Sequence, residues 1–252
     1  MDDAHPHALV IENLSKQYQA AEPPAVDGLS LKIRQGEIFG LLGPNGAGKT
    51  TCISILGTLL PPCSGRVIMG GIDSVQSPRQ ARQHIGLVPQ EIALYPELTA
   101  RENLSFFGKL QGLSGKKLQA GIRMALGAVG LESHAHRRIS TFSGGMKRRA
   151  NLAAGILHDP RVLFLDEPTV GIDAQSRQLI MEKLKDLKEA GTTMVYTTHY
   201  MEEAQSLCDR VAVMDKGRIL AMGAPGALLA DYPRSRNLGE LFLELTGKEL
   251  RD

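Results

Sequence analysis

The feature that most constrains this chain is a glycine-rich loop between an apolar run and a segment compatible with a helix. The apolar run is residues 38–42 and the helical segment is residues 51–56. The loop between them consists of Gly43, Pro44, Asn45, Gly46, Ala47, Gly48, Lys49 and Thr50. A strand, a loop and a helix in this order direct backbone N–H groups and the positive end of the helix dipole at one point, so the loop is expected to bind phosphate.

Two side chains of the loop extend this expectation to a nucleoside triphosphate. Lys49 can reach the terminal phosphates, and the hydroxyl of Thr50 can ligate the Mg²⁺ that accompanies them. The alternative is an accidental glycine-rich turn. With 27 glycines in 252 residues, this spacing arises by chance on the order of once per hundred chains, and the flanking strand and helix favour the phosphate loop.

Composition limits the other possibilities. With 42% hydrophobic residues, the 252 residues can bury one large domain or a core with an inserted subdomain. The formal net charge of +2 is too small to indicate a broad basic surface that would bind nucleic acid. Three cysteines without paired spacing favour a reducing, cytosolic compartment over a disulfide framework or a zinc site. Neither a signal peptide nor a run of about 18 apolar residues is predicted, so a partner must supply any passage across a membrane.

Two carboxylates end the most apolar predicted strand, residues 161–165. Such an uninterrupted apolar run is typical of a central strand in a parallel sheet. Asp166 at its carboxyl end can hold Mg²⁺, directly or through water, and Glu167 can orient or deprotonate an attacking water. The alternative is an acidic surface turn, which the phosphate loop earlier in the chain disfavours.

Two further polar residues follow predicted strands. His199 comes after residues 193–197, and if that strand is parallel to the one before Glu167, its ring lies at the same edge of the sheet. Gln90 comes after residues 85–88 and is either a solvated amide or a ligand of Mg²⁺ or of the attacking water. Additional strands are predicted at residues 9–14, 30–33, 67–69, 210–214 and 218–221.

Helical periods replace strands between residues 91 and 158, which predicts an inserted helical subdomain. Thr99 and Glu102 form a capping-box sequence that opens its first helix. The core-facing side chains are expected to be Leu104, Phe106, Phe107 and Leu110 in the first helix and Leu118, Ile122, Met124, Ala125 and Val129 in the second. One more amphipathic helix, a docking or capping element, is predicted at residues 238–250.

A second anion site is predicted where Ser143 opens the next helix. Ser143 is a natural N-cap, and Gly144 and Gly145 expose backbone N–H groups at the helix start. A capped helix alone would explain the serine. It would not explain two glycines, which weaken a first helical turn.

These elements resemble the nucleotide-binding subunit of an ATP-binding cassette (ABC) transporter over nearly the whole chain. By this resemblance the ATP-binding residues would be Tyr18 on the adenine, residues 43–51 including Thr51 in the Walker A loop, Ser143, Gly144 and Gly145 in the signature motif, and Asp173 in the D-loop. The catalytic and metal-binding residues would be Gln90 in the Q-loop, Asp166 and Glu167 in Walker B, and the switch histidine His199. Met146 stands where the family usually has glutamine, and a modest loss of rate is the expected cost.

The resemblance implies an α/β fold: a P-loop NTPase (RecA-like) core with a mixed sheet, an antiparallel β subdomain and an inserted helical subdomain. One cassette would span residues 8–240. Residues 1–90 and 159–252 would form the catalytic core, and residues 91–158 the helical subdomain that carries the signature motif.

In the family, two subunits meet head to tail, and each ATP lies between the Walker A loop of one and the signature motif of the other. The resemblance therefore implies an ATPase that uses ATP and Mg²⁺, forms a homodimer, and receives an integral membrane permease near residues 91–104 at the cytoplasmic face of the cell membrane. Residues 169–177 and 242–247 resemble ABC-2 type exporters, including drug and antibiotic efflux systems, although heme, polysaccharide and lipid exporters share much of them. The alternative is a soluble, ATP-gated interaction module without transport.

Overall fold

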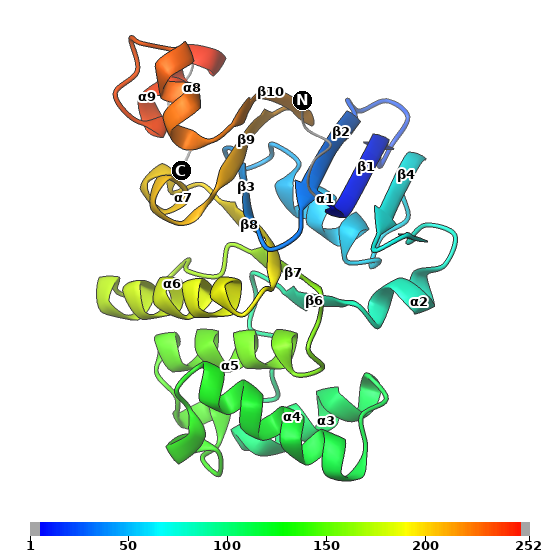
Figure 1. The fold of residues 1–252 in the computed structure, drawn as a ribbon, viewed down its shortest axis with the longest axis vertical. Coiled ribbons are helices and arrows are strands. Elements are labelled where there is room, and N and C mark those ends of the chain that lie inside the picture. The colour runs from blue at the N-terminus through cyan, green and yellow to red at the C-terminus, as the bar shows by residue number, and fades with distance from the viewer. Residues whose placement is uncertain (1–5, 248–252) are drawn as a thin grey trace.

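Two β-sheets of different kinds form the upper part of the molecule in Figure 1. The structure is a computed structural model and describes residues 6–247. The mixed sheet, in the order β10-β9-β3-β8-β7-β6, consists of β3 (Ile38–Leu42), β6 (Ile85–Val88), β7 (Val162–Asp166), β8 (Thr193–Thr198), β9 (Arg210–Asp215) and β10 (Arg218–Gly223). The antiparallel sheet, in the order β2-β1-β4-β5, consists of β1 (His7–Lys16), β2 (Val26–Arg34), β4 (Ser64–Met69) and β5 (Ile72–Asp73). The predicted α/β class, with a mixed sheet and an antiparallel β part, is confirmed.

The central strands of the mixed sheet run parallel. β3 pairs with β8 and β9, and β7 pairs with β6 and β8, each pair in parallel, whereas β9 and β10, which include the strands predicted at residues 210–214 and 218–221, pair antiparallel. All positions of β3, β7 and β8 are buried, as expected for strands covered on both faces. Their carboxyl ends therefore meet at one edge of the sheet.

Alternate side chains of these strands enter two separate cores. In β7, Leu163 and Leu165 belong to the larger core, whereas Val162 and Phe164 belong to the smaller one. The smaller core lies between the two sheets and includes the buried side of α1 (Lys49–Leu56). The glycine-rich loop leads directly into α1. The helix that follows the loop is therefore packed between residues of the two sheets.

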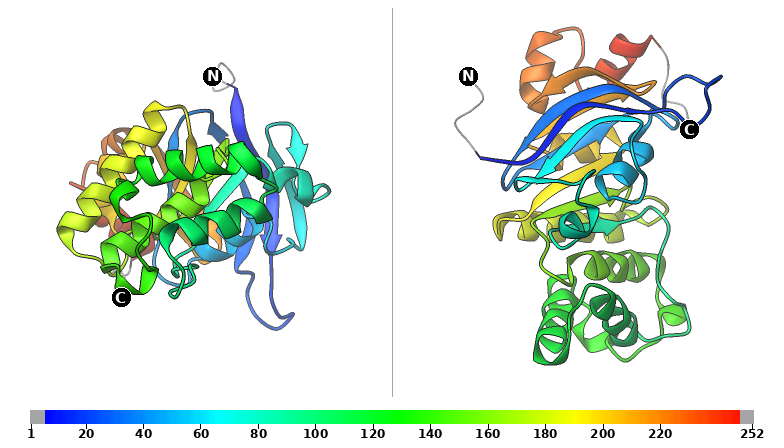
Figure 2. Two further views of the ribbon diagram at one scale, coloured as in Figure 1. Left: turned by 90° about the horizontal axis from the view of Figure 1, so that it is seen from below. Right: turned by 90° about the vertical axis from the view of Figure 1, so that its right-hand side faces the viewer.

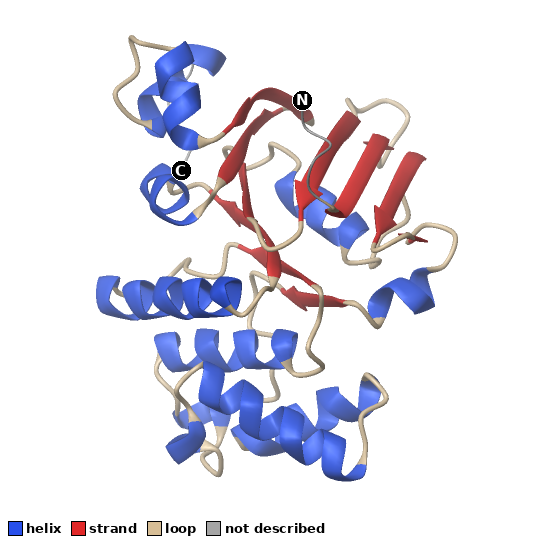
Figure 3. Cartoon of the chain, viewed as in Figure 1, coloured by secondary structure: helices blue, strands red, loops and turns tan. Residues whose placement is uncertain are grey.

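The segment between β6 and β7 consists of helices and loops and forms the lowest layer in Figures 1 and 3. Its helices are α3 (Ala100–Leu110), α4 (Gly115–Ala128) and α5 (Gly144–Ile156), with short 3₁₀ turns at Glu132–His134 and Ile139–Thr141. The predicted capping box is present, since Thr99 Oγ1 accepts from the Glu102 N–H and the Glu102 carboxylate accepts from the Thr99 N–H. The side view in Figure 2 shows this layer beneath the sheets.

The remaining helices cover the mixed sheet or lie at its margins. They are α2 (Pro78–Arg82), α6 (Ala174–Glu189), α7 (Met201–Leu207), α8 (Pro225–Asp231) and α9 (Leu238–Thr246). The last helix was predicted to reach residue 250. It ends before Gly247, which has a φ of 64°, and residues 248–250 lie outside the described part. Among residues 6–247, no helix is both long and apolar enough to cross a membrane.

Three side chains predicted to lie in the core are exposed instead. The exposed fractions are 39% for Phe106, 69% for Leu110 and 43% for Met124. A helical period identifies an apolar face but not how wide a stripe of it a neighbour covers. Phe106 packs edge-on against the surface residue Tyr95, with ring centroids 5.1 Å apart. The prediction of core positions was therefore wrong for these three residues.

Candidate active site

The glycine-rich loop joins β3 to α1, as the sequence predicts. Gly48 has a φ of 102°, and a Cβ there would lie 2.1 Å from the carbonyl oxygen of Ala25. A Cβ at Gly43 would lie 2.2 Å from the carbonyl oxygen of Met214. A Cβ at Gly46 would have no atom of residues 6–247 within 4 Å. Neighbouring backbone thus requires glycine at the two ends of the loop, and space remains at its tip.

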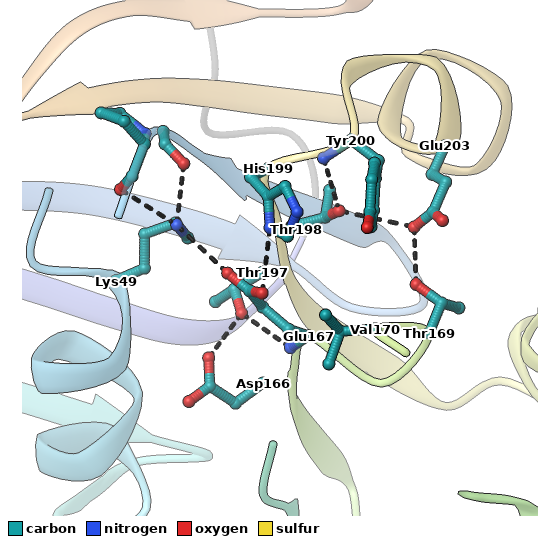
Figure 4. Close-up of polar contacts among 12 residues, drawn as sticks. Lys49, Asp166, Glu167, Thr169, Val170, Thr197, Thr198, His199, Tyr200 and Glu203 are labelled. Atoms are coloured by element: carbon teal, nitrogen blue, oxygen red, sulfur yellow. Dashed lines mark hydrogen bonds and ion pairs between the residues drawn. The ribbon is translucent and has the colours of Figure 1, made fainter. Parts of the chain in front are cut away.

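The lysine of the loop is buried and surrounded by acceptors. Lys49 Nζ donates to the carbonyl oxygens of Gly43 at 2.7 Å and Pro44 at 3.2 Å, and it lies 3.3 Å from Oε1 of Glu167 (Figure 4). Its exposed fraction is 4%. A buried ammonium is stable only with such partners. Phosphate oxygens are acceptors of the same kind and could replace them.

Glu167 and His199 meet at the carboxyl ends of β7 and β8, as expected from parallel strands (Figure 4). Nδ1 of His199 lies 3.0 Å from Oε2 of Glu167. Glu167 is buried and has a φ of 46°, a conformation that costs on the order of 1–3 kcal/mol and is concentrated at functional sites. Its backbone N–H donates to Thr197 Oγ1 at 3.0 Å, which helps to hold it there.

Asp166 ends β7 beside Glu167 but has a different partner. Its Oδ1 accepts a hydrogen bond of 2.6 Å from Thr197 Oγ1, and the side chain is buried. The nearby thiol of Cys52 is not a nucleophile. Burial, with a further contribution from the charge of Asp166, raises the pKa of Cys52 to about 12, so the thiol stays protonated at neutral pH.

A cavity of ≈ 230 Å³ opens over the loop and collects several of the predicted residues. It is lined by Ala25, residues 44–51, Gln90 and Glu167. No side chain in the described part of the chain caps the N-terminus of α1, so the N–H groups of its first turn are available to an anion. The size, the backbone donors and Lys49 fit the phosphates of a nucleotide.

The oxygen donors at this cavity also fit Mg²⁺. Thr50 and Gln90 line it, and Asp166 adjoins Glu167. Within the described chain, no group of three or more His, Cys, Asp and Glu side chains could hold a metal ion on its own. Mg²⁺ usually takes one or two protein oxygens and completes its shell with phosphate and water, so this donor set suits a metal that arrives with its nucleotide.

The loop that carries Gln90 is tied to α5. One guanidinium nitrogen of Arg148 donates to the carbonyl oxygen of Gln90, and another donates to that of Val170 at 2.9 Å. One turn further along α5, Asn151 is buried and donates to the carbonyl oxygen of Pro89 at 3.2 Å. Helix α5 therefore fixes both the loop after β6 and the loop after β7.

The serine and glycines at the start of α5 lie outside this cavity. Ser143 is exposed and acts as the predicted N-cap, accepting from the Met146 N–H at 3.2 Å. Gly144 is exposed, and among the described atoms a Cβ there would approach only Ile172, at 3.7 Å. Gly145 is buried, and a Cβ there would lie 2.2 Å from Ser176 Oγ. Packing inside the chain explains the second glycine but not the first.

Asp173 and Tyr18 also stand apart from the lining of the cavity. Asp173 caps α6 by accepting from the N–H and the hydroxyl of Ser176 at 2.8 and 2.7 Å, and these bonds lower the pKa of its carboxyl. Tyr18 is 59% exposed, and its hydroxyl lies 3.2 Å from Thr51 Oγ1. Tyr18 is therefore next to the loop, whereas Asp173 lies next to the serine-glycine turn.

Comparison with known proteins identifies the family. A family model described as ABC transporter matches residues 26–170, more than half of the chain. The chain belongs to the ABC transporter family. As an ABC protein it binds ATP and is an ATPase, and the family resemblance seen in the sequence is confirmed.

Individual ABC proteins match over most of their length. The linearmycin resistance ATP-binding protein LnrL of Bacillus subtilis (strain 168) is 48% identical over 238 residues, which cover 94% of this chain and 74% of that protein. The Nod factor export ATP-binding protein I of Paraburkholderia xenovorans (strain LB400) is 46% identical over 223 residues, covering 88% and 73%. A solved dimeric, post-hydrolysis ATP-binding cassette bound to ADP and phosphate has a TM-score of 0.77 at 28% identity, covering 86% of this chain and 98% of that chain.

Sequence reasoning missed the residues that support the site of this ABC ATPase from behind. Thr197 binds the side chain of Asp166 and the backbone of Glu167, and Arg148 joins two loops to α5. The only available signals were a pair of threonines before a histidine and a short basic run. Neither pattern specifies a contact.

Proposed function

We propose that this chain is the ATP-hydrolysing subunit of an exporter, in which two copies enclose ATP and drive a substrate through a separate ABC-2 type membrane permease. The observation that carries the proposal is the bridge that Glu167 makes between Lys49 of the phosphate loop and His199. The names of the two relatives, a resistance protein and an export protein, support export. The solved cassette dimer bound to ADP and phosphate supports the paired arrangement.

In the proposed reaction, ATP binding releases the catalytic carboxylate. In the structure, Oε1 of Glu167 lies 3.3 Å from the ammonium of Lys49. The β- and γ-phosphate oxygens compete for the same ammonium, and charge-assisted bonds to phosphate are strong. Once Lys49 turns to the phosphates, this oxygen of Glu167 is free to accept a hydrogen bond from water.

Hydrolysis then follows at the sheet edge. Glu167 orients the water and accepts its proton as the water oxygen attacks the γ-phosphorus and the bond to the β–γ bridging oxygen breaks. His199 holds the carboxylate through Nδ1 and leaves its other ring nitrogen for the γ-phosphate. Lys49 stabilises the negative charge of the leaving ADP. Thr50, Gln90 and Asp166 would hold Mg²⁺, which would neutralise phosphate charge.

The second half of each ATP site comes from the other copy in this proposal. Ser143 and Gly144 are exposed and lie outside the cavity of their own chain, which suits a contact with the nucleotide of a neighbour. Asp173, next to the same turn, would lie at that contact. Tyr18 is exposed beside the loop and would stack on the adenine.

A groove between the sheet core and the helical layer suits the permease. It has a volume of ≈ 230 Å³ and is lined in part by Leu59, Pro89, Ala93, Phe107 and Leu110. Leu59 and Leu110 are 68% and 69% exposed, and neighbouring apolar side chains on a surface mark interaction sites. Docking here, near residues 91–104, would keep the chain on the cytoplasmic face of the membrane.

We propose the domain division on the same grounds. The helices α3–α5 sit between β6 and β7 in the chain and form a separate layer, which supports residues 91–158 as a helical subdomain. Residues 1–90 and 159–252 would be the catalytic core, within one cassette over residues 8–240. The groove then lies at the border of the two parts.

The experiment is the substitution Glu167→Gln. The amide keeps the shape of the side chain but cannot accept the proton of water, so hydrolysis should stop while ATP binding persists. Size-exclusion chromatography with ATP and Mg²⁺ should show a dimer of the variant and a monomer without nucleotide. Hydrolysis at the wild-type rate would refute the role of Glu167, and a monomer with saturating ATP would refute the paired site.

Co-purification from membranes separates export from an interaction module. A partner with several membrane spans that is retained by the wild-type chain, and lost after Leu110→Glu in the groove, supports the permease. The variant Met124→Glu, at another exposed apolar position on a neighbouring helix, is the control and should retain the partner. Retention by both variants, or no such partner, would refute docking in this groove.

A further inference from the structure

A buried carboxylate outside the proposed reaction lies directly behind the pair of Glu167 and His199. Glu203, on α7, is 5% exposed. Its Oε2 accepts from the hydroxyl of Tyr196 at 2.6 Å. The same oxygen accepts from the hydroxyl of Thr169 at 2.8 Å, and Thr198 Oγ1 lies 3.4 Å away (Figure 4). Burial, with a further contribution from Glu203, raises the pKa of Tyr196 well above its usual value, so the phenol stays a donor.

The three hydroxyls come from both sides of the catalytic hydrogen bond. Thr169 is two residues after Glu167, and Thr198 is the residue before His199. Thr198 Oγ1 also accepts from the backbone N–H of Tyr200 at 2.9 Å, which fixes the turn in which His199 lies. One carboxylate therefore holds the loop after β7 and the loop after β8 together.

A second connection runs from Glu203 to the ring of His199. Oε1 of Glu203 lies 3.2 Å from Nε of Arg177. The guanidinium of Arg177 lies over the ring of Tyr200, 4.9 Å from its centroid, and the ring of Tyr200 lies 4.1 Å from that of His199. The imidazole is thus packed against side chains that Glu203 anchors.

This anchoring matters because His199 has space to move. A cavity of ≈ 700 Å³ lies beside it, lined by residues that include His199, Tyr200, Arg177 and Glu203. A histidine ring whose backing is removed could turn toward this space and lose its bond to Glu167. The chain therefore needs a restraint on that side, and the Glu203 contacts provide one.

We propose that Glu203 is a positioning residue of the ATPase reaction, which holds His199 against Glu167 by joining the two loops from behind. This inference rests on the proposed function of Glu167 and His199. Glu203 has no contact with the phosphate loop among the interactions of the described residues. Its loss should therefore slow the chemical step and leave ATP binding unchanged.

The chain offers a matched control in a second buried glutamate. Glu37 is 6% exposed, and its Oε1 lies 3.2 Å from Nη1 of Arg210 and accepts from the Arg34 N–H at 2.8 Å. Glu37 precedes β3, at the amino ends of the parallel strands, whereas His199 follows β8 at their carboxyl ends. Glu37→Gln and Glu203→Gln each remove one buried charge that is paired with an arginine, but only the second lies behind the site.

The experiment compares both variants with the wild-type 252-residue chain. Both are expected to unfold at a lower temperature by CD. For Glu203→Gln, kcat should fall about 10- to 100-fold, as a displacement of about 1 Å at a catalytic group does, with the KM for ATP unchanged. Glu37→Gln should keep the wild-type kcat. Thr169→Val, which removes one hydroxyl and leaves the ion pair with Arg177, should give a smaller fall in kcat and serves if Glu203→Gln does not fold.

Several outcomes overturn the proposal. A wild-type kcat in Glu203→Gln or, if that variant does not fold, in Thr169→Val would do so. So would an equal fall in Glu37→Gln, or a rise in KM with kcat unchanged. If the wild-type chain and Glu203→Gln hydrolyse ATP with the same kcat, only this inference is refuted. If Glu167→Gln hydrolyses ATP at the wild-type rate, the proposed function on which this inference rests is refuted instead.

Discussion

The two glycines of the signature turn are expected to respond in opposite ways to the same small perturbation, an added methyl group. At Gly145 the new Cβ would lie 2.2 Å from Ser176 Oγ and 2.5 Å from Ser176 Cβ. The hydroxyl cannot yield freely, because it donates to Asp173 Oδ2 at 2.7 Å, and the Cβ is attached to the backbone of α6. At Gly144 the nearest atom would be Ile172 Cγ2 at 3.7 Å, an ordinary contact.

The magnitudes follow from these distances. Alanine in place of glycine stabilises a helix by about 0.5–1 kcal/mol, whereas overpacking costs about 1–3 kcal/mol. Gly144→Ala should therefore be neutral or more stable by up to about 1 kcal/mol, and Gly145→Ala less stable by about 1–2 kcal/mol. For a chain of this size, each kcal/mol shifts the midpoint of unfolding by about 2–4 °C.

Activity should not follow stability. Because none of the residues 6–247 needs a glycine at position 144, we expect the added methyl to obstruct the nucleotide of the second copy. Gly144→Ala should therefore fold well and lose ATPase activity about 10-fold or more, the loss expected when donors can no longer reach a developing charge. The assays are thermal unfolding by CD and steady-state phosphate release. Gly145→Ala combined with Ser176→Gly should recover the midpoint of unfolding, since the second change removes the clashing atoms.

Two results would refute this reasoning. If Gly144→Ala hydrolyses ATP at the wild-type rate, the exposed start of α5 does not contact a nucleotide. If Gly144→Ala and Gly145→Ala lower the midpoint of unfolding equally, the contact with Ser176 does not explain why Gly145 is a glycine.

Two further predictions concern the cavity over the phosphate loop. Lys49→Ala removes charge-assisted contacts to the β- and γ-phosphates and should raise the dissociation constant of ATP about 10- to 100-fold; an unchanged constant by calorimetry would contradict the role of Lys49. Arg148→Lys cannot serve both the Gln90 and the Val170 carbonyl as the guanidinium does, so kcat should fall about 3- to 10-fold. The control is Arg149→Lys. Arg149 donates to the carbonyl oxygens of Val129 and Gly130, so this substitution should leave kcat unchanged. Equal changes in kcat for the two substitutions in the same phosphate-release assay would exclude a specific role for Arg148.

The sequence predicts those parts of the site that depend on neighbours in the chain. The strand, loop and helix around Lys49 follow from local pattern, as does the capping box at Thr99. The approach of His199 to Glu167 was predicted from one additional rule, that parallel strands bring their carboxyl ends to one edge. Each of these predictions needed at most one long-range assumption.

Other features required the folded chain. The pairing of Lys49 with Glu167 joins residues that are far apart in the chain and are set side by side by α1 and β7. Glu203 belongs to no sequence motif, and a glutamate on a short helix is ordinarily a surface residue. Only the folded structure shows that its carboxylate is buried and accepts hydrogen bonds from hydroxyl groups. Phe106 was misassigned because periodicity gives the direction of an apolar face without its width. The glycine at 145 was predicted for its backbone N–H, and the structure adds a packing reason.

The exposed position of Ser143, away from its own phosphate loop, has a kinetic consequence under the proposed arrangement. A single molecule carries one half of each of two ATP sites, and it completes neither alone. The rate of ATP hydrolysis should therefore depend on the square of the protein concentration and fall on dilution. Tethering two copies on one permease would raise their local concentration to the millimolar range, roughly what short flexible links achieve. By bringing two copies together, the membrane partner would set the rate of ATP hydrolysis. Copies that are not bound to a permease would hydrolyse little ATP.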